Sequence, residues 1–216
     1  MIINPDSPPK TITALQRELF GPTRQPASAS PHPVPESVAP TLAQQETLSG
    51  LVFSAARTSA AEDLDTLFKI SAQHATLSTA AHESLNLVLE TAEPEDFIGV
   101  LQATARNADA RILATPHIRR VLGIATARNI AAILPILKVA ATDPDWRRAA
   151  AHTIDHIIPD LRHASHRSRA DQSDRAALAE QITLYARADV PEYAAALERQ
   201  AKNEAQIPPR TPLIFG

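Results

Sequence analysis

The segment from His152 to His156, with Asp155 within it, places two imidazoles and a carboxylate on one face of a predicted helix. Side chains four residues apart on a helix are neighbours, so His152 and His156 could bind one metal ion, with His163 or His166 as a third ligand. The corresponding enzymatic hypothesis is a metal-dependent hydrolase. A solvated polar face explains the same residues and is favoured, so we expect no metal, no cofactor and no catalytic residue.

Arginine side chains form a second group that could bind a ligand. Residues 100–170 hold eleven basic and five acidic side chains, whereas residues 46–99 hold nine acidic and two basic ones. Guanidinium groups bind carboxylates and phosphates through paired hydrogen bonds. The candidate basic patch consists of Arg111, Arg119, Arg120, Arg128 and Arg148. It predicts an anionic surface on a protein partner, with nucleic acid as the alternative.

A polar stretch, residues 159–175, carries a third candidate site. The 45-residue spacing between the starts of two successive helix pairs, at Ile133 and Leu178, predicts an insertion after Pro159, and insertions of this kind often bind partners. The candidate partner-binding residues are Arg162, His163, Arg167 and Arg169. An ordinary solvated loop is the simpler interpretation.

Composition excludes several classes of protein. The chain has 216 residues, no cysteine and a net charge of −3. A disulfide scaffold, a thiolate metal site and a cysteine nucleophile are therefore excluded. Five glycines and 4% aromatic residues argue against a β-sandwich or a glycine-rich nucleotide fold. No apolar run is long enough to cross a membrane, and the N-terminus does not resemble a signal peptide, so we expect a cytoplasmic or nuclear protein without membrane insertion.

Proline separates two tails from a helical body. Nine of the 18 prolines lie within residues 1–40, which are predicted to be a disordered tail. Residues 11–20 within that tail predict a short amphipathic helix, the tethered helix, whose apolar face consists of Ile12, Leu15, Leu19 and Phe20. This helix either folds back on the body or binds another protein. Residues 206–216 are predicted to be a second tail.

The body, residues 41–205, is predicted to be all-α because its apolar residues recur every three or four positions. The helices are expected at 42–58, 60–74, 79–92, 94–107, 115–123, 127–141, 145–159, 173–187 and 190–204. Ser59 with Glu62 suggests a capping box. Glu93-Pro94, Thr115-Pro116 and Asp143-Pro144 suggest helix starts, since proline is favoured at the first helical position.

Four segments of this body read as related helix pairs. They begin at Leu64, Phe97, Ile133 and Leu178, which are separated by 33, 36 and 45 residues. The segment 133–158 resembles a HEAT repeat in its Leu-Pro-Ile-Leu helix, its Asp-Pro-Asp turn and the arginine that follows. The resemblance implies a short right-handed α-solenoid, in which Asp143 or Asp145 and Arg147 contact neighbouring repeats. An irregular helical bundle is the alternative fold.

The function expected from these features is a non-enzymatic scaffold or adaptor that binds protein partners through a helical-repeat surface with acidic and basic patches. Nothing in the sequence indicates a small-molecule substrate. The alternatives are a nucleic-acid-binding HEAT-like protein that uses the basic patch and a secreted bacterial effector with a helical body. The effector hypothesis depends on the Ser/Pro-rich N-terminal residues, which resemble a secretion leader.

Overall fold

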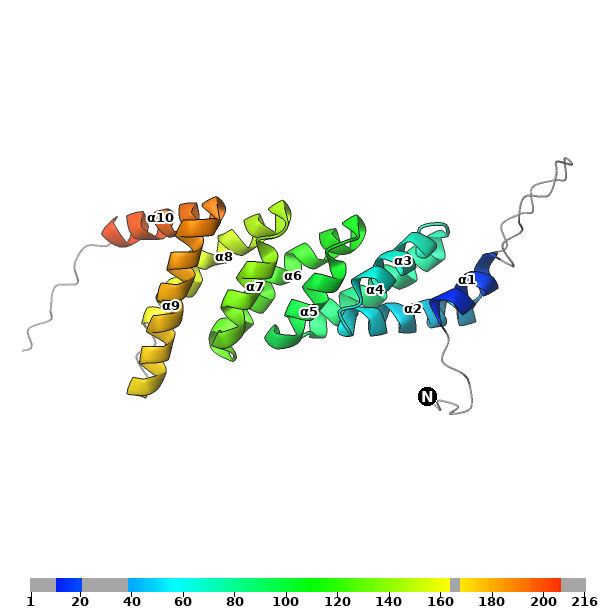
Figure 1. The fold of residues 1–216 in the computed structure, drawn as a ribbon, viewed down its shortest axis with the longest axis horizontal. Coiled ribbons are helices and arrows are strands. Elements are labelled where there is room, and N and C mark those ends of the chain that lie inside the picture. Colours follow the sequence, from blue (N-terminus) through cyan, green and yellow to red (C-terminus); the bar gives the residue numbers. More distant parts are fainter. Residues whose placement is uncertain (1–10, 21–38, 164–167, 207–216) are drawn as a thin grey trace, which may run out of the picture. The chain divides into compact units, whose positions relative to one another are not determined.

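The computed structural model describes residues 11–20, 39–163 and 168–206, and for Phe20 the backbone only (Figure 1). Within these ranges every regular element is helical, which confirms the all-α prediction. The two predicted tails lie outside the described residues, except for residues 11–20 and 39–40 and the single residue Gln206.

The described elements are ten α-helices and one 3-10 turn. Their bounds are α1 Ile12–Phe20, α2 Leu42–Arg57, α3 Ala61–Ser71, α4 Ala75–Thr91, α5 Pro94–Thr104, α6 Ala108–Ala127, η1 Ile130–Ala132, α7 Ile133–Ala140, α8 Pro144–Arg162, α9 Arg169–Asp189 and α10 Pro191–Gln206. Each predicted helix has a counterpart among these, with four starts moved: from 79 to Ala75, from 115 to Ala108, from 127 to η1 at Ile130, and from 173 to Arg169.

The chain divides into two compact units. The first consists of residues 1–92 and 99–114, and the second of residues 93–98 and 115–216. The chain therefore passes from one unit to the other three times, twice inside the helices α5 and α6.

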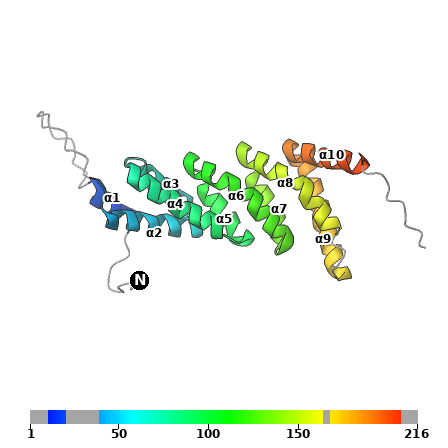
Figure 2. The same ribbon diagram turned by 180° about the vertical axis from the view of Figure 1, so that it is seen from behind.

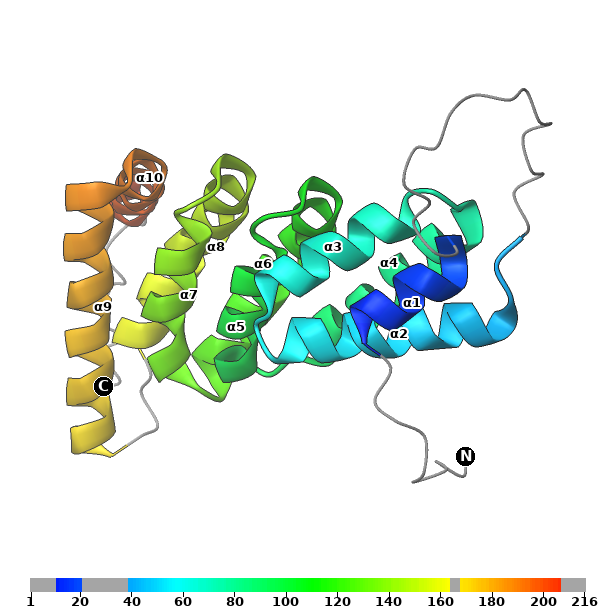
Figure 3. The ribbon, with the colours of Figure 1, turned by 45° about the vertical axis from the view of Figure 1, so that its right-hand side comes forward.

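The first unit is built around α2, which packs against α4, α3 and α1 (Figure 3). Its core holds fully buried leucines from several helices, among them Leu48, Leu64, Leu77 and Leu85. The tethered helix α1 folds back onto α2 and α3, and Leu15 is only 1% exposed. The amphipathic pattern of residues 11–20 thus predicted the helix, and of the two alternatives left open for it the structure shows the one in which the helix folds back on the body.

The second unit joins α8 to α9 and α10, and α7 to α8 and α9 (Figure 2). Trp146, in the first turn of α8, is fully buried, as expected for a packing residue. Tyr193 of α10 is also buried, and its hydroxyl donates a 2.9 Å hydrogen bond to the carbonyl of Leu137 in α7. This bond fixes the start of α10 against the end of α7.

Two helix starts follow local chemistry that the sequence made visible. Asp143 caps α8 by accepting hydrogen bonds from the amides of Asp145 and Trp146, and Pro144 occupies the first helical position. Helix α5 likewise begins at Pro94. A capping box is present at a different place from the predicted one: Thr41 and Gln44 form it at the start of α2.

Two predicted starts were wrong. Ser59 does not cap α3, whose N-cap is Ala60; instead Ser59 adopts a left-handed conformation with φ 58° in the α2–α3 turn. Pro116 does not begin a helix, because α6 runs through it from Ala108 to Ala127. The stripe of buried side chains from Ala110 to Ala125 explains this, since its burial outweighs one lost backbone hydrogen bond.

The predicted insertion at 159–175 is mostly helical. Helix α8 continues to Arg162 because Leu161 extends its buried stripe, and Ser168 caps α9 by accepting from the amide of Asp171. Arg175, the last residue of the predicted insertion and also within the helix predicted at 173–187, is 3% exposed within α9, with its Nε 3.7 Å from an Asp171 carboxylate oxygen. Between the two helices, residues 164–167 lie outside the described part.

One local geometry recurs 36 residues apart. Asn107 caps α6 through its side-chain oxygen, as Asp143 caps α8. Four residues after each cap an arginine turns back to the preceding turn. Arg111 donates to the carbonyl of Ala105 at 3.0 Å, and Arg147 donates to that of Ala141 at 3.2 Å. The two turns therefore use the same cap-plus-arginine arrangement, although only one carries an aspartate.

Candidate functional site

A groove of about 390 Å³ between α8 and α10 is the strongest candidate binding site, and it lies wholly within the second unit. Its lining residues are Arg148, Ala151, His152, Asp155, Glu192, Ala195 and Arg199. On α8 these positions recur every three or four residues, as they do on α10, so each helix presents one face to the groove. The paired alanines keep the space between the helices open because they carry only a methyl group.

Charged side chains flank the alanines, and some of them are already paired. Arg148 forms an ion pair with Asp145 on its own helix. Glu192 lies 3.3 Å from Nε of Arg147, which joins α8 to the first turn of α10. The resemblance to HEAT repeats implied such a contact for Arg147, and the acidic partner is on α10 rather than in the α7–α8 turn.

The remaining groove residues are His152, Asp155 and Arg199. The Asp155 side chain is 23% exposed, yet its Oδ1 is covered and accepts no hydrogen bond within the described residues. Covering a carboxylate oxygen without a donor costs free energy. Neither His152 nor Arg199 forms a hydrogen bond or an ion pair with another described residue. The groove thus offers an imidazole and a guanidinium as donors and a carboxylate as acceptor.

The predicted metal ligands are only partly together. His152 and Asp155 both line the groove, whereas His156 does not and is 83% exposed. The closest approach of His156 to Asp155 is 3.8 Å from Nε2 to Oδ1. His163 is exposed at the end of α8, and His166 lies outside the described residues. In the described ranges no three His, Asp or Glu side chains are placed to hold a metal ion.

The predicted basic patch is divided between the two units. Arg111 belongs to the first unit and is half-buried against the carbonyl of Ala105, whereas Arg119, Arg120, Arg128 and Arg148 belong to the second. Arg128 lies 3.9 Å from Glu93, and Arg148 pairs with Asp145. Only Arg148 lines the groove. Of the predicted insertion residues, Arg162, His163 and Arg169 are exposed at helix ends, and Arg167 lies outside the described residues.

The net charges of the two units differ from those of the acidic and basic runs in the sequence. The first unit holds ten acidic and seven basic residues, a net −3, and the second holds fourteen of each. The acidic run 46–99 and the basic run 100–170 do not coincide with the units, because residues 93–98 join the second and 99–114 the first. Acidic and basic side chains from the two runs therefore meet as ion pairs.

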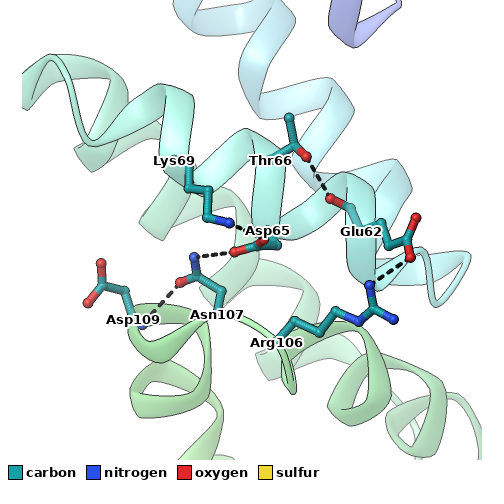
Figure 4. Close-up of polar contacts among 7 residues, drawn as sticks. All are labelled: Glu62, Asp65, Thr66, Lys69, Arg106, Asn107 and Asp109. Atoms are coloured by element: carbon teal, nitrogen blue, oxygen red, sulfur yellow. Dashed lines mark hydrogen bonds and ion pairs between the residues drawn. The ribbon is translucent and has the colours of Figure 1, made fainter.

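Figure 4 shows such a meeting in the first unit, where α3 contacts the turn between α5 and α6. Arg106 donates to Glu62 at 2.7 Å, and Asn107 donates to Asp65 at 3.1 Å. Lys69 contacts the other oxygen of Asp65 at 2.6 Å. The hydrogen bond from Lys69 is the main reason that the pKa of Asp65 is lowered from its ordinary value. This network joins α3 to the α5–α6 turn.

Sequence reasoning missed half of the groove. Glu192, Ala195 and Arg199 were not singled out, although their spacing places them on one face of α10. The pattern alone could not show that this face lies beside His152 and Asp155, because α9 separates the two helices in the chain.

No helix in the described ranges is both long and apolar enough to cross a bilayer. Comparison of the chain with family models, curated proteins and solved structures found no match.

Proposed function

We propose that this chain is a non-enzymatic adaptor that binds a segment of a protein partner in the groove between α8 and α10. The observation that carries the proposal is the groove itself, in which an alanine floor is bordered by His152 and Arg199, which have no hydrogen bond or ion pair among the described residues, and by the partly exposed carboxylate of Asp155. We further propose that the helix pairs form a HEAT-like solenoid.

The recurring turn supports the solenoid. Asn107 with Arg111 and Asp143 with Arg147 repeat one arrangement at a separation of 36 residues, a spacing typical of two-helix repeats. The Arg147–Glu192 contact then joins one helix pair to the next within the second unit. Repeat proteins use extended surfaces of this kind to bind other proteins.

The mixed charge of the groove favours a polypeptide over nucleic acid. Asp155 and Glu192 would repel the phosphates that Arg148 and Arg199 attract. A polypeptide supplies both kinds of group, because its amides and basic side chains donate to a carboxylate while its acidic side chains and carbonyls accept from Arg199 and His152. Small apolar side chains would cover Ala151 and Ala195.

Asp155 offers an acceptor to a partner in the groove. A partner donor that reaches the exposed part of its carboxylate gains a charge-assisted hydrogen bond. Such bonds contribute about 1.5–3 kcal/mol. We expect Asp155 to contribute more to binding than the surface ion pairs around it.

A pair of tryptophan variants on α10 tests the site. Ala195 lines the groove and is exposed, so Ala195→Trp should fill the groove without disturbing the core. Ala201→Trp, on the same helix but outside the groove, is the matched control. Full-length protein and both variants are used for affinity capture from lysate with and without nuclease treatment, followed by mass spectrometry.

We expect a partner that is retained by the parent protein and by A201W and lost by A195W. Identical retention by A195W would place the interface elsewhere, and the absence of any specific protein would overturn the adaptor proposal. If retention disappears only after nuclease treatment and falls steeply with salt, the partner is nucleic acid.

A further inference from the structure

The tethered helix α1 occupies a surface of α2 and α3 in the first unit, far along the chain from the α8–α10 groove. It runs antiparallel to α2, because Glu18 is joined to Gln44 whereas Ile12 lies near Leu51 and Ser54. The bond from Gln44 Nε2 to the carbonyl of Glu18 is 3.2 Å long. Helix α1 is nine residues long.

Helix α1 makes only a small contact with α2 and α3. Among residues 12–19 of α1, Leu15 is the one buried side chain, whereas Ile12 and Leu19 are only partly covered. Isolated helices of this length are unstable in water, so α1 is helical only while it is docked. Docking and folding of α1 are therefore one equilibrium that a competitor can shift.

The docked helix also leaves space beneath it. A pocket of about 360 Å³ lies between the first turn of α1 and its neighbours. Its lining residues are Thr11, Ile12, Thr13, Leu51, Ser54, Ala55, Thr58 and Asp63. A side chain larger than isoleucine at position 12 would gain apolar contact with Leu51 and Ala55, so α1 fits this surface incompletely.

We infer that the surface of α2 and α3 beneath α1 is a docking site for an amphipathic helix of a protein partner. The partner helix carries a leucine at the position of Leu15 and an aromatic residue at that of Ile12. The seated helix defines the leucine position, and the open pocket defines the larger side chain. Helix α1 is the resident occupant and is displaced when the partner binds. This inference is independent of the α8–α10 groove.

The competition has a predictable size. Residues 21–38 connect α1 to the segment that precedes α2. Because of this connection, α1 competes for its docking surface as if it were present at an effective concentration of roughly millimolar. A helix that binds from solution must compete with α1 at that effective concentration. Binding in trans should therefore be at least about tenfold tighter when α1 is prevented from docking.

Fluorescence anisotropy with a fluorescein-labelled peptide tests this. The peptide spans residues 9–22, in its natural sequence and with Ile12→Phe. It is titrated with the full-length protein, with full-length Leu15→Glu, which cannot bury position 15, and with Gln16→Glu, an exposed control on the same helix. We expect the Ile12→Phe peptide to bind Leu15→Glu protein at least about tenfold more tightly than wild type or Gln16→Glu. The peptide of natural sequence should bind the Leu15→Glu protein several-fold more weakly than the Ile12→Phe peptide does.

Equal binding to the wild-type and Leu15→Glu proteins, or no binding to either, would overturn the inference. Since Leu15→Glu could also unfold the first unit, a second variant keeps the test decisive. Ile12→Phe in the full-length chain should slow amide hydrogen exchange of residues 12–19 by several-fold. Unchanged or faster exchange would show that the pocket does not accept the larger side chain. Dimerisation of Leu15→Glu with added wild type would instead identify a second copy as the occupant.

Discussion

At the scale of single residues, Ser59 and Gly99 show how a turn determines the residue opposite it. Ser59 has a φ of 58°, a conformation that favours glycine, and its hydroxyl oxygen lies so close to Gly99 that a Cβ on residue 99 would clash with it. Gly99 belongs to α5, where glycine is about 1 kcal/mol less favourable than alanine. Glycine at position 99 therefore lowers the helix propensity of α5 but allows the close contact with Ser59.

Gly99→Ala should bring little or no gain in the parent chain, because the new methyl group displaces the Ser59 hydroxyl. In a Ser59→Gly chain the same substitution should raise the free energy of unfolding by about 1 kcal/mol. Urea denaturation of the four chains of this double-mutant cycle measures the coupling. Equal effects of Gly99→Ala in both backgrounds would show that the contact is unimportant.

Asp65 predicts a pH dependence of stability. Because its folded-state pKa is lowered, chiefly by the hydrogen bond from Lys69, its stabilising contribution is present above the unfolded pKa of about 3.9. The contribution is lost as the pH falls through the folded-state pKa. The difference in unfolding free energy between wild type and Asp65→Asn should therefore shrink between pH 6 and pH 3.

Chemical denaturation at several pH values measures that difference. Asp174→Asn, at an exposed aspartate of α9, is the control and should differ little from wild type at either pH. A difference for Asp65→Asn that is constant with pH would show that the ion pair with Lys69 does not stabilise the fold.

At the scale of elements, α6 is the helix whose length was hardest to predict. Pro116 has no amide hydrogen, so it cannot complete the backbone hydrogen bond within α6. The helix continues because Ala114, Ile118 and Val121 are buried on its apolar face. Tertiary burial thus overrides a strong local signal.

Pro116→Ala should stabilise the protein, by up to about 3 kcal/mol, because Pro116 is exposed and its removal sacrifices no core contact. The melting temperature and the urea midpoint should both rise. Pro144→Ala is the matched control: this exposed proline is the first residue of α8, where proline is favoured, so its replacement should bring no gain. An unchanged urea midpoint in Pro116→Ala would show that the proline does not destabilise α6.

At the scale of the whole molecule, the chain passes between two units inside α5 and α6. A helix propagates cooperatively, so melting one part of α6 should destabilise the rest. We therefore expect the two units to unfold together. Leu85 is fully buried in the first unit, and Trp146, the only tryptophan, is buried in the second.

Leu85→Ala should cost about 2–5 kcal/mol and lower the urea midpoint reported by Trp146 fluorescence as much as the midpoint reported by circular dichroism. Two separate transitions, with the fluorescence midpoint unchanged, would show that the units unfold independently.

The amino-acid sequence alone predicted the all-α class, most helix positions, the apolar face of α1 that contains Leu15, and the start of α8 at Asp143-Pro144. These features depend on helical periodicity and on hydrogen bonds between residues a few positions apart. Long-range packing determines that α6 passes through Pro116, that Arg175 is buried, and that charges from two oppositely charged runs meet as ion pairs. It also determines that Arg199 of α10 borders the same groove as Asp155 of α8. Those outcomes depend on contacts between residues far apart in the chain, which composition and spacing do not encode.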